Sequence, residues 1–141
     1  MLKFELVTLA GIKFQGEAHE VVLPTADGYI AVFTHHAPLV SLATPGVIRV
    51  RHKAGDSDER MEIFATNGGV IEIADNTVRV LVDEADRDDE INEAEAQKAY
   101  DEAKQLAAQA KDSLSLQQAQ ALIDRQAVRL QVAGLRRRKR R

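Results

Sequence analysis

The feature that most constrains this chain of 141 residues is a change of hydrophobic period near residue 82. Between Leu2 and Val82, apolar side chains recur at every second position, the spacing of strands that bury one face. One such segment, 77–82, has three valines that alternate with Thr, Arg and Leu. After Val82 the spacing lengthens to three and four, which is typical of amphipathic helices. The sequence therefore predicts an α+β protein with a β-rich part followed by a helical part.

Short turn signals divide the β-rich part. They are Ala10-Gly11, Ala26-Asp27-Gly28, Thr44-Pro45-Gly46, Ala54-Gly55-Asp56, Asn67-Gly68-Gly69 and Ala74-Asp75-Asn76. Many short strands at this spacing predict a β-sandwich or a barrel. We expect the Gly68-Gly69 pair to form a bulge or a tight turn between two strands.

Two helices are expected in the second part. Asn92, with Glu95 three residues later, resembles a capping box at the start of a helix that runs to Ala110. Ser115 predicts a second cap, with a second helix from about 116 to 135. A short turn between the helices predicts an antiparallel hairpin. One face of the first helix is mostly alanine, which buries little area, so we expect the hairpin to be held weakly.

The segment Asp83–Glu90, between the two parts, is acidic and contains almost no apolar residue. We interpret it as a solvated linker joined to the acid-rich first turn of a helix, where negative charge suits the helix dipole. A metal-binding loop is the less favoured alternative. The sequence thus divides into a β domain at residues 1–86 and a helical domain with a basic tail at residues 87–141.

The net charge of −3 conceals a strong asymmetry. Residues 1–90 carry 8 basic and 16 acidic side chains, whereas residues 91–141 carry 11 and 6. This difference indicates two surfaces with different partners. The chain has no cysteine, no apolar run long enough to span a membrane and no leader-like beginning. We therefore expect a soluble, unprocessed cytoplasmic protein from a bacterium.

The sequence offers no catalytic or metal-binding motif. The four histidines lack ligand spacing, and none of the glycine-rich places forms a phosphate-binding loop. The chain is therefore predicted not to be an enzyme.

The last six residues, Arg136–Arg141, are all basic. They fit three interpretations: a tail that complements the C-terminal end of a helix, a nucleic-acid contact, or a dock for an acidic protein surface. The absence of aromatic residues from the second helix and the tail argues against base stacking.

Several motifs together resemble the ATP synthase epsilon subunit family. Leu23–Val40 contains a glycine-led strand at Gly28–Val32 and a His36-Ala37-Pro38-Leu39 run; it is followed by Pro45-Gly46, Gly68-Gly69, Asn76 and the strand Val78–Leu81. The resemblance implies a ten-stranded β-sandwich followed by an antiparallel two-helix hairpin. It also implies a non-catalytic rotor subunit in the central stalk of a proton-translocating F-type ATP synthase, bound to the gamma subunit and the c-ring.

The resemblance also implies roles for particular residues. Asp27, Gly28 and Tyr29 would face the c-ring, and His36, Ala37 and Pro38 would face the gamma subunit. The hairpin would either fold against the sandwich or extend into the head and brake ATP hydrolysis. There Arg125, Arg129, Arg136, Arg137 and Arg138 would meet acidic segments of the beta subunits, beside the alpha subunits. The protein would then lie peripherally on the cytoplasmic side of the bacterial inner (cell) membrane, without inserting into it.

The chain departs from the family pattern at several places. Ala31 stands where the family has a glycine, and Thr34-His35 stands where it has a Pro-Gly before the histidine. Tyr29 stands where relatives often carry an acidic residue. Some relatives bind ATP through an (Ile/Leu)-Asp-x-x-Arg-Ala motif, but here Asn92 and Glu95 replace its Asp and Arg. Each lost charged hydrogen bond costs about 1.5–3 kcal/mol, so we predict no ATP binding and no cofactor. Two competing hypotheses remain: a basic-tailed β-domain that binds nucleic acid, and a nucleotide sensor.

Overall fold

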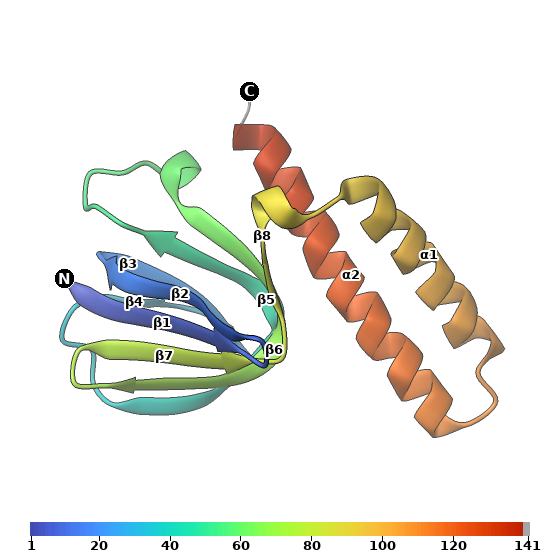
Figure 1. The fold of residues 1–141 in the computed structure, drawn as a ribbon. Helices are drawn as coiled ribbons and strands as arrows, with labels where there is room; N and C mark the ends of the chain where they lie inside the picture. The colour runs from blue at the N-terminus through green and yellow to red at the C-terminus, as the bar shows by residue number, and fades with distance from the viewer. Residues whose placement is uncertain (140–141) are drawn as a thin grey trace.

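The computed structural model describes residues 1–139, which form a β-sandwich and a helical hairpin (Figure 1). The strands are β1 (Leu2–Thr8), β2 (Gly11–Ala18), β3 (Glu20–Thr25), β4 (Gly28–Val32), β5 (Leu39–Arg51), β6 (Glu62–Ala74), β7 (Thr77–Val82) and β8 (Ala85–Arg87). Two 3₁₀ turns, η1 (Asp58–Arg60) and η2 (Asp88–Glu90), and two α-helices, α1 (Glu93–Gln109) and α2 (Ser113–Lys139), complete the described fold. The α+β class predicted from the change of period is confirmed.

The strands form one hydrogen-bonded sheet that folds over on itself. Its order is β2-β1-β7-β6-β5-β3-β4, and β8 pairs with the first half of β6. Strands β5 and β6 are 13 residues long and antiparallel, and they bend together in the middle. The second half of β6 pairs with β7. The two long strands therefore pass from one layer of the sandwich to the other.

The described residues contain eight strands, so the expectation of ten is wrong. The difference lies in Thr44-Pro45-Gly46 and Asn67-Gly68-Gly69, which were interpreted as turns between strands. In the structure they lie opposite each other inside β5 and β6, where Pro45 pairs with Asn67. They bend the two strands without ending them; dividing each long strand at this bend would give ten.

The bend is stabilised by glycine and by side-chain hydrogen bonds. Gly68 has a φ of 98°, which favours glycine, and a Cβ on Gly69 would lie 1.9 Å from the carbonyl oxygen of Leu81. The pairing of β5 with β6 keeps one register on both sides of Gly68-Gly69, so the bulge or tight turn expected at this pair is not found. The backbone N–H of Val47 donates to the Tyr29 hydroxyl oxygen over 3.1 Å.

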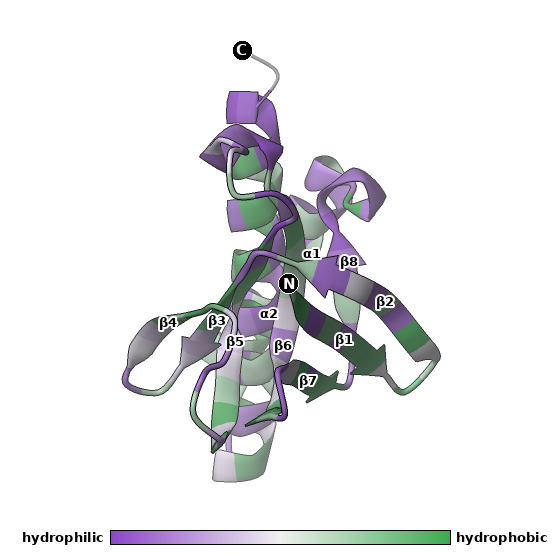
Figure 2. Ribbon diagram, turned by 90° about the vertical axis from the view of Figure 1, so that its left-hand side faces the viewer, coloured by the Kyte–Doolittle hydropathy of each residue, from purple (hydrophilic) through white to green (hydrophobic). Residues whose placement is uncertain are grey.

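The sandwich core contains large side chains from both layers. Phe4 and Phe64 are fully buried, and Phe14 packs beside both. In Figure 2 hydrophobic and hydrophilic residues form bands along β1 and β2, as expected for strands with one buried face. A second cluster lies on the outer face of β5 and β6 and comprises Val47, Ile63, Ala65, Ile91, Ala96, Val128, Val132 and Ala133.

The first helix begins as predicted, and the second does not. The Asn92 side chain accepts a hydrogen bond from the N–H of Glu95 over 3.1 Å, which confirms the first cap. At the second helix the Asp112 carboxylate accepts from the N–H of Ser115 over 2.7 Å, so Asp112 is the cap and the prediction of Ser115 was wrong. Helix α2 is also longer than expected and includes Arg136 to Lys139.

Helix α2 packs on β5 and β6, and α1 packs on the other side of α2 (Figure 1). Val128 and Val132 meet Val47, Ile63 and Ala65 of the sheet in the second cluster. These three sheet residues point out of the sandwich and are buried because α2 covers them. Within residues 1–139, neither helix is long and apolar enough to cross a membrane.

Candidate functional site: a charged strap beneath a basic helix, and an exposed apolar row

Acidic side chains alternate along the segment that connects the sandwich to the hairpin. We call Glu84, Asp86 and Asp88 the acidic strap. All three pair with basic residues of α2. The residues between them turn the other way: Ala85 joins the sandwich core, and the Arg87 guanidinium lies 5.7 Å from the centroid of the Phe64 ring. Asp86 lies within β8, and Glu84 and Asp88 lie directly on either side of it; all three acids face the same helix.

The first two acids of the strap pair with arginines of α2 in the same order along the chain. Glu84 forms an ion pair with Arg125, and Asp86 lies 3.7 Å from Nε of Arg129. The second pair is the less exposed of the two, with side-chain exposures of 21% and 28%. Low exposure reduces the screening of this pair by solvent and salt.

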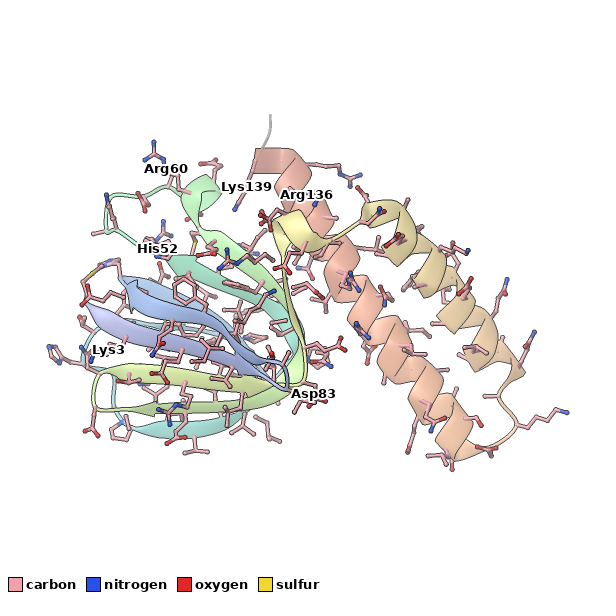
Figure 3. All side chains as sticks on the ribbon, viewed as in Figure 1. Lys3, His52, Arg60, Asp83, Arg136 and Lys139 are labelled. Atoms are coloured by element: carbon pink, nitrogen blue, oxygen red, sulfur yellow. The ribbon has the colours of Figure 1, made fainter. Side chains whose placement is uncertain are left out.

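The end of α2 completes the contact (Figure 3). Nη1 of Arg136 donates to the carbonyl oxygens of Asp88 and, over 2.9 Å, of Ile91. Lys139 donates to the Met61 carbonyl and lies 3.8 Å from the Asp88 carboxylate. These groups also satisfy carbonyl oxygens at η2, where the chain leaves the sheet.

Two further arginines of the predicted inhibitory set lie outside the strap contact. Arg137 pairs with Glu93 of α1 at 2.7 Å, and Arg138 is exposed. Arg140 and Arg141, the last two residues of the basic tail, lie outside the described residues. The predicted arm residues Arg125, Arg129, Arg136 and Arg137 therefore all contact other parts of this chain in the docked arrangement. The interpretation of 83–90 as a solvated linker is wrong for the strap.

Some polar atoms of α2 have no hydrogen-bond partner. Among the described residues, Oε1 of Gln126, Nε of Arg129 and Nε of Arg136 are buried without a hydrogen-bond partner. A buried polar group left without a partner costs about 1–3 kcal/mol. All three belong to α2.

A second candidate surface lies on the outer face of the other layer of the sandwich. We call it the apolar row. Its members face one another across five neighbouring strands in the order Ile12, Val7, Leu81, Val70 and Leu42. Leu42 is 70% exposed, Ile12 63% and Leu81 43%. A contiguous exposed apolar face of this kind marks an interaction surface.

A charged row runs beside the apolar row. Arg79 of β7 is flanked by Glu5 of β1 and Glu72 of β6 in the strand register. Nε of Arg79 donates to the Glu5 carboxylate over 2.9 Å, and this bond raises the pKa of Arg79. The surface therefore offers a partner an apolar stripe bordered by two carboxylates and one guanidinium.

The loop predicted to face the gamma subunit leads directly into this surface. Ala37 and Pro38 are exposed, His36 is partly exposed, and β5 follows with Val40 and Leu42 pointing outward. Neighbouring side chains fix the loop, because the Asn76 side chain accepts from the N–H of His35 over 2.9 Å. The same amide donates to the Met1 carbonyl over 2.9 Å.

The turn predicted to face the c-ring lies at the opposite end of β4. Asp27 and Gly28 are exposed, and Gly28 has a φ of 111° with open space around it. Tyr29 is 52% exposed, but its hydroxyl is held by Val47 at the bend of β5. Tyr29 thus has a structural contact that the sequence did not reveal.

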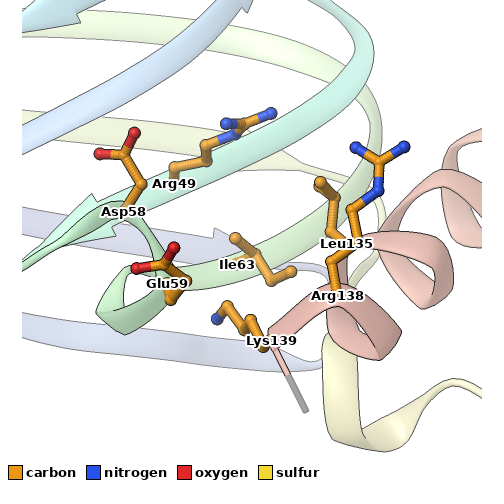
Figure 4. A pocket seen from close by; sticks show the side chains of 7 residues that line it. All are labelled: Arg49, Asp58, Glu59, Ile63, Leu135, Arg138 and Lys139. Carbon is orange, nitrogen blue, oxygen red and sulfur yellow. The ribbon is translucent and has the colours of Figure 1, made fainter. Parts of the chain in front are cut away.

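A small groove lies between the end of α2 and η1 (Figure 4). It measures about 190 Å³, and its charged lining is mixed, with Arg49, Arg138 and Lys139 facing Asp58 and Glu59. Such a lining favours neither an anion nor a cation. Across residues 1–139, no group of three or more His, Cys, Asp or Glu side chains is placed to hold a metal ion.

Comparison with known proteins identifies the class of fold and then the family. Residues 1–88 match the family described as the ATP synthase delta/epsilon chain β-sandwich domain. An ATP synthase epsilon chain of Xanthomonas campestris pv. campestris is 34% identical over 92% of this chain and 90% of its own length. One from Neisseria meningitidis serogroup C is 34% identical over 84% of this chain and 83% of its own length.

The fold recurs in a solved assembly. A chain in the cryo-EM structure of the Euglena gracilis mitochondrial ATP synthase, comprising OSCP, F1 and the c-ring, superposes with a TM-score of 0.76. It is 21% identical, and the match covers 92% of this chain and 79% of that one. The present chain belongs to the epsilon-chain family of ATP synthases.

Proposed function

We propose that this chain is a non-catalytic rotor subunit in the central stalk of a bacterial, proton-translocating F-type ATP synthase. In this proposal the sandwich (1–86) is the anchor and the hairpin (87–141) is a brake on ATP hydrolysis. The observation that carries this proposal is a difference between two surfaces of the chain. The apolar row is free to bind, whereas the arginines of α2 are occupied by the strap.

The apolar row is the proposed dock for the gamma subunit. It is continuous along β5 with the loop that contains His36, Ala37 and Pro38, so the two together make one surface. Asp27, Gly28 and Tyr29, at the far end of β4, would then remain available for the c-ring. The sandwich would thereby join the gamma subunit to the ring, and the chain would lie peripherally on the cytoplasmic side of the inner membrane.

The brake requires that α2 leave the sandwich. The cluster that undocking would expose consists mostly of valine and alanine, with Ile63 and Ile91 as its larger members, so the two arrangements can differ by a few kcal/mol. Once extended, Arg125, Arg129 and Arg136 would reach acidic segments of the beta subunits. The nucleic-acid hypothesis is disfavoured, because α2 and the basic tail contain no aromatic residue on which bases could stack. The prediction that no ATP is bound remains part of the proposal.

The test is ATP hydrolysis by the alpha–beta–gamma head, titrated with the full chain and with a version that ends at Glu90. The shorter chain keeps β8 and η2. We expect both to bind the gamma subunit and only the full chain to slow hydrolysis. Equal hydrolysis rates with the two chains would contradict the braking role.

A charged substitution in the apolar row tests whether this surface binds the gamma subunit. Leu81→Glu should weaken binding to the gamma subunit roughly tenfold or more, because central apolar contacts dominate interfaces. Leu106→Glu is the matched control, since Leu106 is an exposed leucine on α1. Equal binding by the two variants would remove the row from the interface.

A further inference from the structure

We infer that the acidic strap is an internal competitor that holds the arginines of α2 in place of an acidic partner. The observation is a match between the strap and α2, which run side by side in the same direction. Glu84 pairs with Arg125 and Asp86 with Arg129, so two residues along the strap correspond to four along the helix. The inference deepens the proposed braking role and, in its last step, rests on it.

Backbone geometry explains why this register works. Two residues of a strand advance about 6.6 Å. Four residues of an α-helix advance about 6.0 Å. Acids at alternate positions of an extended segment therefore face arginines on successive turns of a helix with little mismatch.

Beyond Asp86 the contact is made by longer side chains that reach back. Side chains of an α-helix tilt toward its N-terminus, so Arg136 and Lys139 lie further along α2 than the atoms they bind. Both reach Asp88, one at its carbonyl oxygen and the other at its carboxylate. The strap is thus held along its whole length by one face of α2.

The partner that this face fits is an extended segment with acids at alternate positions. While the strap occupies the face, such a segment has to displace it, and releasing the strap undocks the hairpin. Hydrophobic contacts between α2 and the sheet add to the attachment but do not select the partner. The strap therefore sets how readily the proposed brake is applied.

The experiment is a charge swap with a direct measure of docking. The chain has no cysteine, so Lys53→Cys and Gln117→Cys provide two exposed labelling positions, one on the sandwich and one near the hairpin tip. Energy transfer between the two dyes reports the open fraction of the free subunit. Glu84→Arg is expected to raise that fraction roughly tenfold, since it replaces an ion pair by a repulsion.

The swapped variant, Glu84→Arg with Arg125→Glu, should return the open fraction to within about twofold of the unmodified chain. Glu102→Arg makes the same charge change on an exposed position of α1 and serves as the control. An open fraction unchanged by Glu84→Arg, or raised equally by Glu102→Arg, would overturn the inference. Failure of the swap to restore docking would also overturn it.

Hydrolysis by the head separates this inference from the proposed function. Glu84→Arg should inhibit more strongly than the unmodified chain, and Arg125→Glu should inhibit less although it also opens the hairpin. One combination of results would contradict the inference alone: Glu84→Arg opens the hairpin and removal of residues 91–141 relieves inhibition, but Glu84→Arg does not increase inhibition. In that case the strap is not a competitor. If the chain that ends at Glu90 slows hydrolysis as much as the full chain does, the braking role itself fails.

Discussion

The inside of the sandwich and the interface between the sandwich and α2 are both apolar, but they are built from side chains of different size. The sandwich core uses Phe4, Phe64 and several leucines and isoleucines, all nearly inaccessible to solvent. The helix interface relies mostly on valine and alanine, with Ile63 as its largest member from the sheet.

This difference explains how one chain can combine a stable domain with a helical hairpin that can undock. Burial of large apolar side chains contributes about 1.5–3 kcal/mol each, whereas alanine contributes much less. Ion pairs supply part of the attachment of α2, and they can be exchanged for equivalent pairs with another protein. The core has no such substitute. The hairpin is therefore the region that can leave without unfolding the rest.

The largest expected effect comes from truncation in the core. Phe64→Ala should lower the free energy of unfolding of the sandwich by about 3–5 kcal/mol, because it removes a fully buried ring and leaves a cavity. Chemical denaturation followed by circular dichroism measures the change. A loss below about 1 kcal/mol would show that the core is not the stable region.

Truncation at the helix interface should act locally. Val132 of α2 is fully buried against the sheet, and Val132→Ala removes two methyl groups, worth about 1.5 kcal/mol. We expect the fraction of molecules with an undocked hairpin to rise and the unfolding midpoint of the sandwich to stay the same. Energy transfer and denaturation together check this expectation. Loss of sandwich stability to the same extent would mean that the two regions unfold as one.

Asn76→Ala should loosen the loop that precedes the apolar row. The substitution removes bonds to His35 and Met1 and leaves alanine at a φ of 58°, a conformation that asparagine tolerates better. The expected cost is about 1–2 kcal/mol, with faster amide exchange in residues 33–38. The same change in exchange rate at the hairpin would contradict the assignment of Asn76 to this loop.

The smallest effect concerns the start of α2 and is visible in acid. The Asp112 carboxylate accepts hydrogen bonds from Ser115, which lowers its pKa. A lowered folded-state pKa gives stability that is present above the unfolded value of about 3.9 and is lost as the pH falls through the folded value. We expect the first turn of α2 to fray in that range. Asp112→Asn should keep the cap and abolish this pH dependence, as followed by the amide resonance of Ser115.

The sequence predicted local patterns better than long-range ones. Alternation identified strands, and Asn92 with Glu95 identified the first helix cap. The strand count failed because Pro45-Gly46 and Gly68-Gly69 have the composition of turns, and only the pairing of β5 with β6 turns them into a shared bend. Asp112 was passed over because Ser115 satisfied the same capping rule three residues later.

Residues of both candidate surfaces stand out in the sequence, but their role depends on partners from distant parts of the chain. Glu84, Asp86 and Asp88 already show the period of a strand, but their partners lie about 40 residues or more along the chain. Leu81 occupies an outward position in an otherwise regular alternation, and strand register then aligns it with Val70 and Val7. Neither pairing can be read from spacing within one segment.

The most direct test of the account is native-state hydrogen exchange of the full chain at two salt concentrations, about 0.05 M and about 0.5 M. Exchange measures the opening free energy of each region separately. We expect amides of α2 near Val128 and Val132 to open with a smaller free energy than those of β1 beside Phe4. We also expect salt to lower only the former, because screening weakens the strap. One shared opening free energy for both regions, unaffected by salt, would contradict the account.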